Sequence, residues 1–233
     1  MLFKRVKLGI TLLILLFLLG ILMAACNSET TDPEPEEPEE TEEPAETDES
    51  EEEPADEGPQ MGGTLTGAMD TAPAGVFNPI FYQEAYEANI LDFTHEGLVS
   101  QNEELGFEPN LAKEWTINED QTEITLKLEE GVTWHDGEPF TAEDVVFTYK
   151  AISSPGYVEA GGIRTDYAVR LLGYEAFNSG ETDEFEGVVA EDDLTVTFKF
   201  AEPNVTILKD VSFSIIPEHI FGDVPIAEIP SHP

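Results

Sequence analysis

The stretch VTWHDGEPFTAED, residues 132–144, holds the side chains of this chain that are best suited to chemistry. It carries one histidine and four carboxylates, which are His135, Asp136, Glu138, Glu143 and Asp144. An imidazole beside carboxylates is able to ligate a metal ion or to relay protons in a hydrolase. No nucleophile, third ligand or oxyanion device accompanies this cluster, so catalysis is the weaker of two interpretations.

The other interpretation assigns local structural roles to the same acids. Asp136-Gly137 is a strong turn signal, and Thr141 before two acids fits the N-cap and first turn of a helix. His135 and Glu138 then stay unexplained, and two residues do not make a metal site. The other histidines, His95, His219 and His232, stand singly in unrelated contexts. We therefore expect no metal, no cofactor and no enzymatic activity.

The amino-terminal residues predict export. Lys4, Arg5 and Lys7 precede an uncharged apolar run at 8–25, which ends at Cys26, the only cysteine. A retained membrane helix fits the length of this run. The Ala-Ala-Cys ending instead favours a bacterial lipoprotein, whose signal peptide, residues 1–25, is cleaved before a lipid is attached to Cys26. The localisation that follows is the outer face of the cell membrane.

Residues 26–60 predict a disordered acidic tether. Residues 27–60 hold seventeen acidic residues and six prolines, with no basic and no large apolar side chain. Such a segment cannot pack a core and extends by charge repulsion, although binding of calcium or of a partner is an alternative role.

The charge of the whole chain excludes one class of partner. The formal net charge is −40, and residues 61–233 alone carry about 26 excess negative charges. Nucleic acid is excluded, because phosphate binding needs the opposite sign. A surface this acidic suits a salt-loving or alkali-loving source, where high salt screens the repulsion.

Residues 61–233 predict a mixed α/β or α+β body. Two segments alternate apolar and polar residues as half-buried strands do, at 123–128 and 194–200. Residues 62–69 are predicted as a short strand before a loop. Residues 83–97 predict a helix that buries Tyr86, Ile90 and Phe93 and stops at a left-handed Gly97.

EITLKLEEGVTWHDGEPFTAEDVVFTYKAI, residues 123–152, closely resembles the signature of the family 5 extracytoplasmic solute-binding proteins, which include oligopeptide- and dipeptide-binding proteins of ABC importers. Four shorter stretches are similar to the same family: GGTLTGAMDTAPAGVFNP, NILDFTHEGLV, EPNLAKEWTI and FSIIPEHIF. Together they run in order through residues 61–233.

The resemblance implies a class II periplasmic-binding-protein-like fold that closes on a ligand between two lobes. Residues 61–98 would begin the first lobe, 99–210 would form an inserted subdomain away from the cleft, and 211–233 would return to the first lobe. Family members continue further, so we expect this chain to be an amino-terminal fragment that lacks the second lobe. The signature stretch would be scaffold, with Trp134 and Phe140 packing.

The resemblance also implies where a ligand would bind. The loop after the first strand, whose small residues would admit a peptide strand, gives the candidates Asp70, Thr71, Ala72, Ala74, Gly75, Val76 and Asn78. A plain connecting loop is the alternative. The variable segment 154–167 of the inserted subdomain adds Tyr157 and Arg164.

The leading hypothesis is a lipid-anchored receptor that captures oligopeptides and delivers them to ABC permease subunits. Binding of another solute, such as nickel, haem or a sugar, is one alternative. A truncated acidic surface lipoprotein without a ligand is the other.

Overall fold

The computed structural model describes residues 62–64 and 66–232. The predicted signal peptide, the lipidation site Cys26 and the acidic tether lie outside these residues. No helix in the described part of the chain is long and apolar enough to cross a bilayer.

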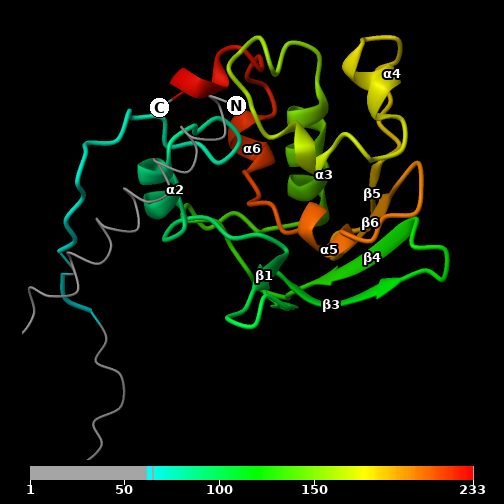
Figure 1. The fold of residues 1–233 in the computed structure, drawn as a ribbon, viewed down its shortest axis with the longest axis horizontal. Helices are drawn as coiled ribbons and strands as arrows, with labels where there is room; N and C mark the ends of the chain where they lie inside the picture. Colours follow the sequence, from blue (N-terminus) through cyan, green and yellow to red (C-terminus); the bar gives the residue numbers. More distant parts are fainter. Residues whose placement is uncertain (1–61, 65, 233) are drawn as a thin grey trace, which may run out of the picture. The chain divides into compact units, whose positions relative to one another are not determined.

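The main sheet of the described fold has four antiparallel strands in the order β3-β4-β6-β5. The other elements are five helices, two short 3₁₀ turns and a separate two-stranded ladder, β1-β2, and α3 stands on one side of the sheet (Figure 1). The strands are β1 (Val99–Gln101), β2 (Phe107–Pro109), β3 (Ala112–Ile117), β4 (Glu123–Leu128), β5 (Val188–Asp192) and β6 (Thr195–Lys199). The helices are α2 (Ala85–Leu91), α3 (Ala142–Ser153), α4 (Tyr174–Asn178), α5 (Ile207–Asp210) and α6 (Glu218–Phe221), with 3₁₀ turns at Thr165–Tyr167 and Ile229–Ser231.

The two predicted alternating strands are confirmed as the middle pair of this sheet. Ile124, Leu126 and Leu128 of β4 are fully buried, whereas Lys127 is exposed. In β6, Val196 and Phe198 are buried opposite Leu126 and Ile124. Period-two alternation places these side chains on one face, where they form the core.

Helix α3 covers the apolar face of the sheet, which makes a two-layer mixed α+β core as predicted (Figure 1). The ring of Tyr149 meets Phe198 edge to face at 4.7 Å, and its hydroxyl donates to the carbonyl of Asp210 at 2.8 Å. The helix begins after Thr141, as expected, and the Thr141 amide donates to Asp144 Oδ2 at 2.9 Å. This bond satisfies one of the free amides at the helix start.

Three expectations for the first part of the fold are wrong: the first strand, the buried face of the helix, and the role of Gly97. Residues 66–69 form no strand and are exposed, because no neighbouring strand pairs with them among the described residues. Helix α2 buries Glu87 and Leu91, whereas Phe93 lies beyond its end and is 83% exposed. The helix ends at Leu91 with Asp92 as its C-cap, so Phe93 cannot belong to the buried face that the sequence predicted.

Gly97 is not a left-handed helix stop, since it pairs in extended form with Ser214. A β-carbon at Gly97 would collide with the carbonyl of Ser212, so the glycine allows two backbones to approach closely. Next to it, the Ile215 amide donates to the Glu96 carbonyl at 3.1 Å. The segment near residue 215 is therefore paired with the segment that follows α2.

Candidate functional site

The predicted ligand loop is exposed over most of its length. Asp70, Thr71, Ala72, Ala74 and Gly75 are exposed, Val76 is half-buried and Asn78 is buried. Among the described residues, no hydrogen bond involves the backbone of residues 70–74. The loop therefore presents free backbone donors and acceptors to solvent.

Two buried polar side chains fix the end of this loop. Glu87 of α2 is 1% exposed, and its Oε1 accepts from the Gly75 amide at 2.9 Å, where Gly75 has a φ of +100°. Asn78 Oδ1 accepts from the Ile80 amide at 3.1 Å, and its carbonyl accepts from Phe81 and Tyr82. A glycine tolerates this φ without strain, so the loop is pinned at Gly75 and turns at Asn78.

Sequence reasoning missed Glu87, because a charged residue in a helix is expected to face solvent. The one feature of the sequence that indicates its burial is the spacing of four residues between Glu87 and the apolar Leu91, which places both on one helix face. The second oxygen of Glu87, Oε2, is buried without a hydrogen-bond partner among the described residues.

The structure brings Tyr157 and Arg164 to the segment that follows the loop. Tyr157 is fully buried and its hydroxyl donates to the carbonyl of Ile80, while the Arg164 amide donates to that hydroxyl at 3.2 Å. The Arg164 guanidinium donates to the Tyr82 carbonyl at 3.1 Å and lies 4.0 Å above the Tyr82 ring. Burial raises the pKa of Tyr157 to about 12, so the phenol stays a donor.

Both candidates therefore lie beside the loop segment, but Tyr157 presents no surface to a ligand. Gln83 adds a third link, since its Nε2 donates to the Gly161 carbonyl at 2.9 Å. These bonds join residues 80–83 to residues 157–164, and Tyr157 contributes to the site only by positioning its neighbours.

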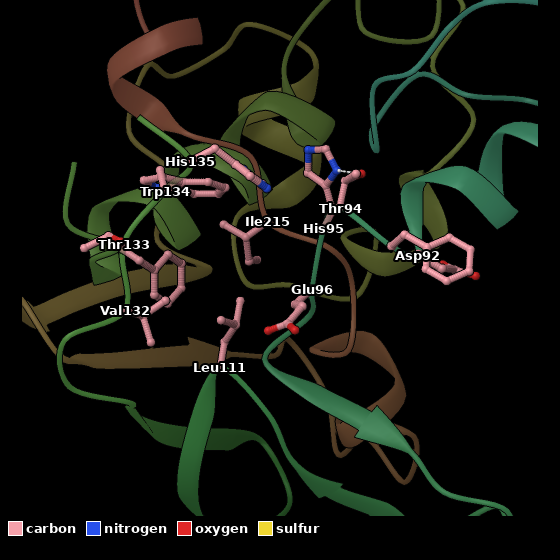
Figure 2. Close-up of a pocket in the computed structure, with 12 residues that line it drawn as sticks. Asp92, Thr94, His95, Glu96, Leu111, Val132, Thr133, Trp134, His135 and Ile215 are labelled. Carbon is pink, nitrogen blue, oxygen red and sulfur yellow. Dashed lines mark hydrogen bonds between the residues drawn. The ribbon is translucent and has the colours of Figure 1, made fainter. Parts of the chain in front are cut away.

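A hollow of about 480 Å³ lies against the end of the loop. Gly75, Phe77 and Asn78 form one side of it, and Ile220 and Phe221 of α6 form another. A second hollow, of about 290 Å³, shares His95, Trp134 and His135 with the first (Figure 2). The signature stretch thus forms a wall beside the predicted loop.

The expectation that the histidines stand in unrelated contexts is also wrong. His95, His135 and His232 line the larger hollow, and His219 Nε2 lies 2.7 Å from Oδ2 of Asp136, which lines it too. Four segments that are far apart in the sequence meet here, and no local pattern predicts that. Within residues 62–64 and 66–232, however, no group of three or more His, Cys, Asp or Glu is arranged to hold a metal ion.

The acids of the stretch have the structural roles that were expected of them. Asp136 Oδ1 accepts from the Glu138 amide at 3.2 Å within the turn, where Gly137 has a φ of +96°. Asp144 also accepts from the Glu218 amide at 2.8 Å and from the Trp134 indole at 3.3 Å. The Trp134 ring packs edge to face on Phe140 at 5.9 Å. The stretch is therefore scaffold that also shapes the hollow.

Burial and charge shift the pKa values of His95 and His219. Burial, with a smaller contribution from the charge of His135, lowers the pKa of His95 to about 4, so this imidazole is neutral near pH 7. The hydrogen bond to Asp136 raises the pKa of His219, and the same bond lowers the pKa of Asp136.

Comparisons with known proteins agree with this geometry. Residues 106–232 match the family model of bacterial extracellular solute-binding proteins, family 5. A putative ABC transporter peptide-binding protein of Brucella ovis is 30% identical over 168 residues, which cover 70% of this chain and 28% of that protein. The oligopeptide-binding protein AppA of Bacillus subtilis is 26% identical over 228 residues, covering 97% of this chain and 36% of AppA.

The structure of Bacillus subtilis AppA in complex with a nonapeptide is similar at 27% identity, with a TM-score of 0.56 over 68% of this chain and 29% of AppA. The periplasmic-binding-protein-like fold implied by the resemblance is thus confirmed, and the chain spans about a third of the length of these relatives. Because the family model covers more than half of the chain, including the four-stranded sheet, the capped helix and the signature stretch, the protein belongs to family 5 of the bacterial extracellular solute-binding proteins.

Proposed function

We propose that the protein captures oligopeptides outside the membrane and delivers them to the permease subunits of an ABC transporter. The relatives in the comparisons carry peptide-binding names, which supports a peptide as the ligand. Residues 70–78, together with Tyr157 and Arg164 as supports, would form this chain's part of the binding site. The lipid anchor at Cys26 would hold the receptor at the outer face of the membrane.

The observation that carries the proposal is the exposed, unpaired backbone of residues 70–74, which is followed by the pinned Gly75. An extended peptide is recognised by backbone hydrogen bonds to such a segment, and small side chains such as Ala72 and Ala74 let the two backbones approach. A loop fixed at one end loses less conformational entropy on binding than a free loop does.

Peptide binding by the full chain in detergent tests the ligand class. Ligand-observed NMR with a mixed tetrapeptide pool, in high salt, should detect dissociation constants of about 1 mM, because contacts on an exposed loop stay hydrated. Nickel, haem and a sugar serve as competing solute classes. Binding of one of these without any peptide signal would contradict the proposal.

A loop variant tests the site. Ala72→Pro with Ala74→Pro removes two exposed amides that bond to nothing, so the fold should survive while peptide signals weaken by about fivefold or more. Peptides with N-methylated backbones are the matched ligand control and should bind as weakly to the unmodified chain. Unchanged binding by the double variant would exclude the loop.

The anchor has a separate test. Cys26→Ser should leave an unprocessed, heavier precursor by intact mass when the chain is made in a bacterial host, and the protein should no longer acquire lipid. Normal maturation of that variant would refute the lipoprotein proposal and leave the ligand proposal untouched.

A further inference from the structure

The smaller hollow contains carboxylates that lack a cationic partner. Asp92 and Glu96 line it, and neither side chain forms an ion pair or hydrogen bond among the described residues. Glu96 and Leu111 both line this hollow and lie next to each other in the view of Figure 2. Both residues are exposed, so their carboxylates are open to a cation that enters the hollow.

His95 adds a hydrogen-bond acceptor to the same hollow. Thr94 Oγ1 lies 3.2 Å from the Leu91 carbonyl and 2.9 Å from His95 Nδ1, so one side of the imidazole is held by a hydrogen bond (Figure 2). In the tautomer that donates from Nδ1 to Thr94, Nε2 keeps its lone pair as an acceptor. The lowered pKa of His95 keeps the imidazole neutral above about pH 5.

The remaining lining is apolar and aromatic. It consists of Phe93, Leu111, Val132, Trp134, Phe140 and Ile215, with Thr133 and His135. An aliphatic stem would contact these side chains, and a cation at its end would reach Glu96, His95 Nε2 and the Trp134 ring. An anionic group would meet two carboxylates and an acceptor lone pair instead.

We propose that this hollow receives the side chain of a lysine or arginine from the bound peptide, so that the protein prefers basic peptides. This inference rests on the proposed function. The larger hollow connects the two sites, since it contains Gly75, Phe77 and Asn78 of the ligand loop and shares His95, Trp134 and His135 with the smaller one.

Trp134 reports on occupancy directly. The chain has two tryptophans, so Trp115→Phe leaves Trp134 as the only indole, and it lines both hollows. The full chain with this substitution is titrated with acetylated and amidated Ala-X-Ala peptides, where X is lysine, arginine, norleucine or glutamate. The blocked ends leave the side chain as the only difference in charge. Salt at about 1 M shortens the screening length to about 3 Å and removes the general attraction of the acidic surface.

We expect the lysine and arginine peptides to bind at least about fivefold more tightly than the norleucine peptide, and the glutamate peptide to bind most weakly. Glu96→Gln should reduce that preference to less than about twofold without changing norleucine binding. The exposed Glu96 carboxylate has no bonding partner in the described part of the chain, so the fold is retained. Glu119→Gln is the matched control, because it removes the same charge in the turn between β3 and β4 and should keep the preference.

The outcomes separate the two proposals. Equal binding of the lysine and norleucine peptides, or a preference that survives Glu96→Gln, overturns the basic-side-chain pocket while peptide binding stands. A preference lost equally in Glu119→Gln shows general charge attraction and also overturns it. Failure of every peptide to bind overturns the proposed function, and this inference with it.

Discussion

The sheet with α3 and the loop before α2 are stabilised in different ways. Strands β4 and β6 bury continuous apolar faces, so many dispersed contacts share the stabilisation. The loop at residues 70–78 buries little apolar surface and is fixed by single polar bonds from Glu87 and Asn78, followed by the Tyr157 bond at Ile80. One region is robust because its contacts are many, whereas the other depends on a few buried hydrogen bonds, which suits a binding loop on a rigid body.

Leu126→Ala should give the largest loss, because it removes a fully buried side chain from the middle of the sheet. We expect about 3 kcal/mol of unfolding free energy to be lost in urea denaturation, from lost burial and the cavity that remains. Lys127→Ala, at the neighbouring exposed position, should change the stability by less than about 0.5 kcal/mol. Similar losses at both positions would show that the sheet is not the stabilising region.

Tyr157→Phe should cost about 2 kcal/mol, because it leaves the buried Ile80 carbonyl without its donor while keeping the ring. Urea denaturation measures the loss, and limited proteolysis should show faster cleavage within residues 70–83. Tyr86→Phe is the control, since the hydroxyl of that half-buried tyrosine bonds to nothing in the described residues. An unchanged cleavage rate in Tyr157→Phe would show that the Tyr157 hydroxyl does not restrain the loop.

Glu87→Ala should act locally. The Gly75 amide loses its acceptor, so its hydrogen-exchange protection should fall by about 1 kcal/mol of opening free energy. The global stability should change little, because the same substitution removes a buried carboxylate whose Oε2 has no partner. Glu84→Ala, at an exposed position just before α2, should leave the Gly75 amide protected. A large global loss without local change would contradict this view of the loop.

The pair of His219 and Asp136 should give the smallest effect, because both side chains are substantially exposed. The pKa of His219 is raised above 6.5, so its contribution is complete below pH 6.5 and declines as the pH rises through the raised value. The pKa of Asp136 is lowered below 3.8, so its contribution is lost as the pH falls through the lowered value.

The melting temperature of the unmodified chain should therefore exceed that of His219→Gln most between about pH 4 and 6.5, and the two should converge above the raised pKa. Proton NMR titration of His219, alone and with Asp136→Asn, provides the direct measurement. If the pKa of His219 is the same with and without Asp136→Asn, this contact is absent in solution.

The sequence by itself determined the elements whose pattern is local. Alternation predicted β4 and β6, Asp136-Gly137 predicted the turn, and Thr141 predicted the start of α3, because each depends on neighbours within a few residues. The predicted strand was wrong for residues 66–69, because a strand also needs a partner strand, which no local pattern supplies.

Only the tertiary structure decided how distant segments meet. The pairing of Gly97 with Ser214, the burial of Glu87 against Gly75, and the gathering of His95, His135 and His232 around one hollow join residues that are 12 to 137 positions apart. Such contacts are set by how whole elements pack and by which buried polar groups find partners. Single residues of the same types occur on any protein surface, so their spacing in the chain carries no signal of the site.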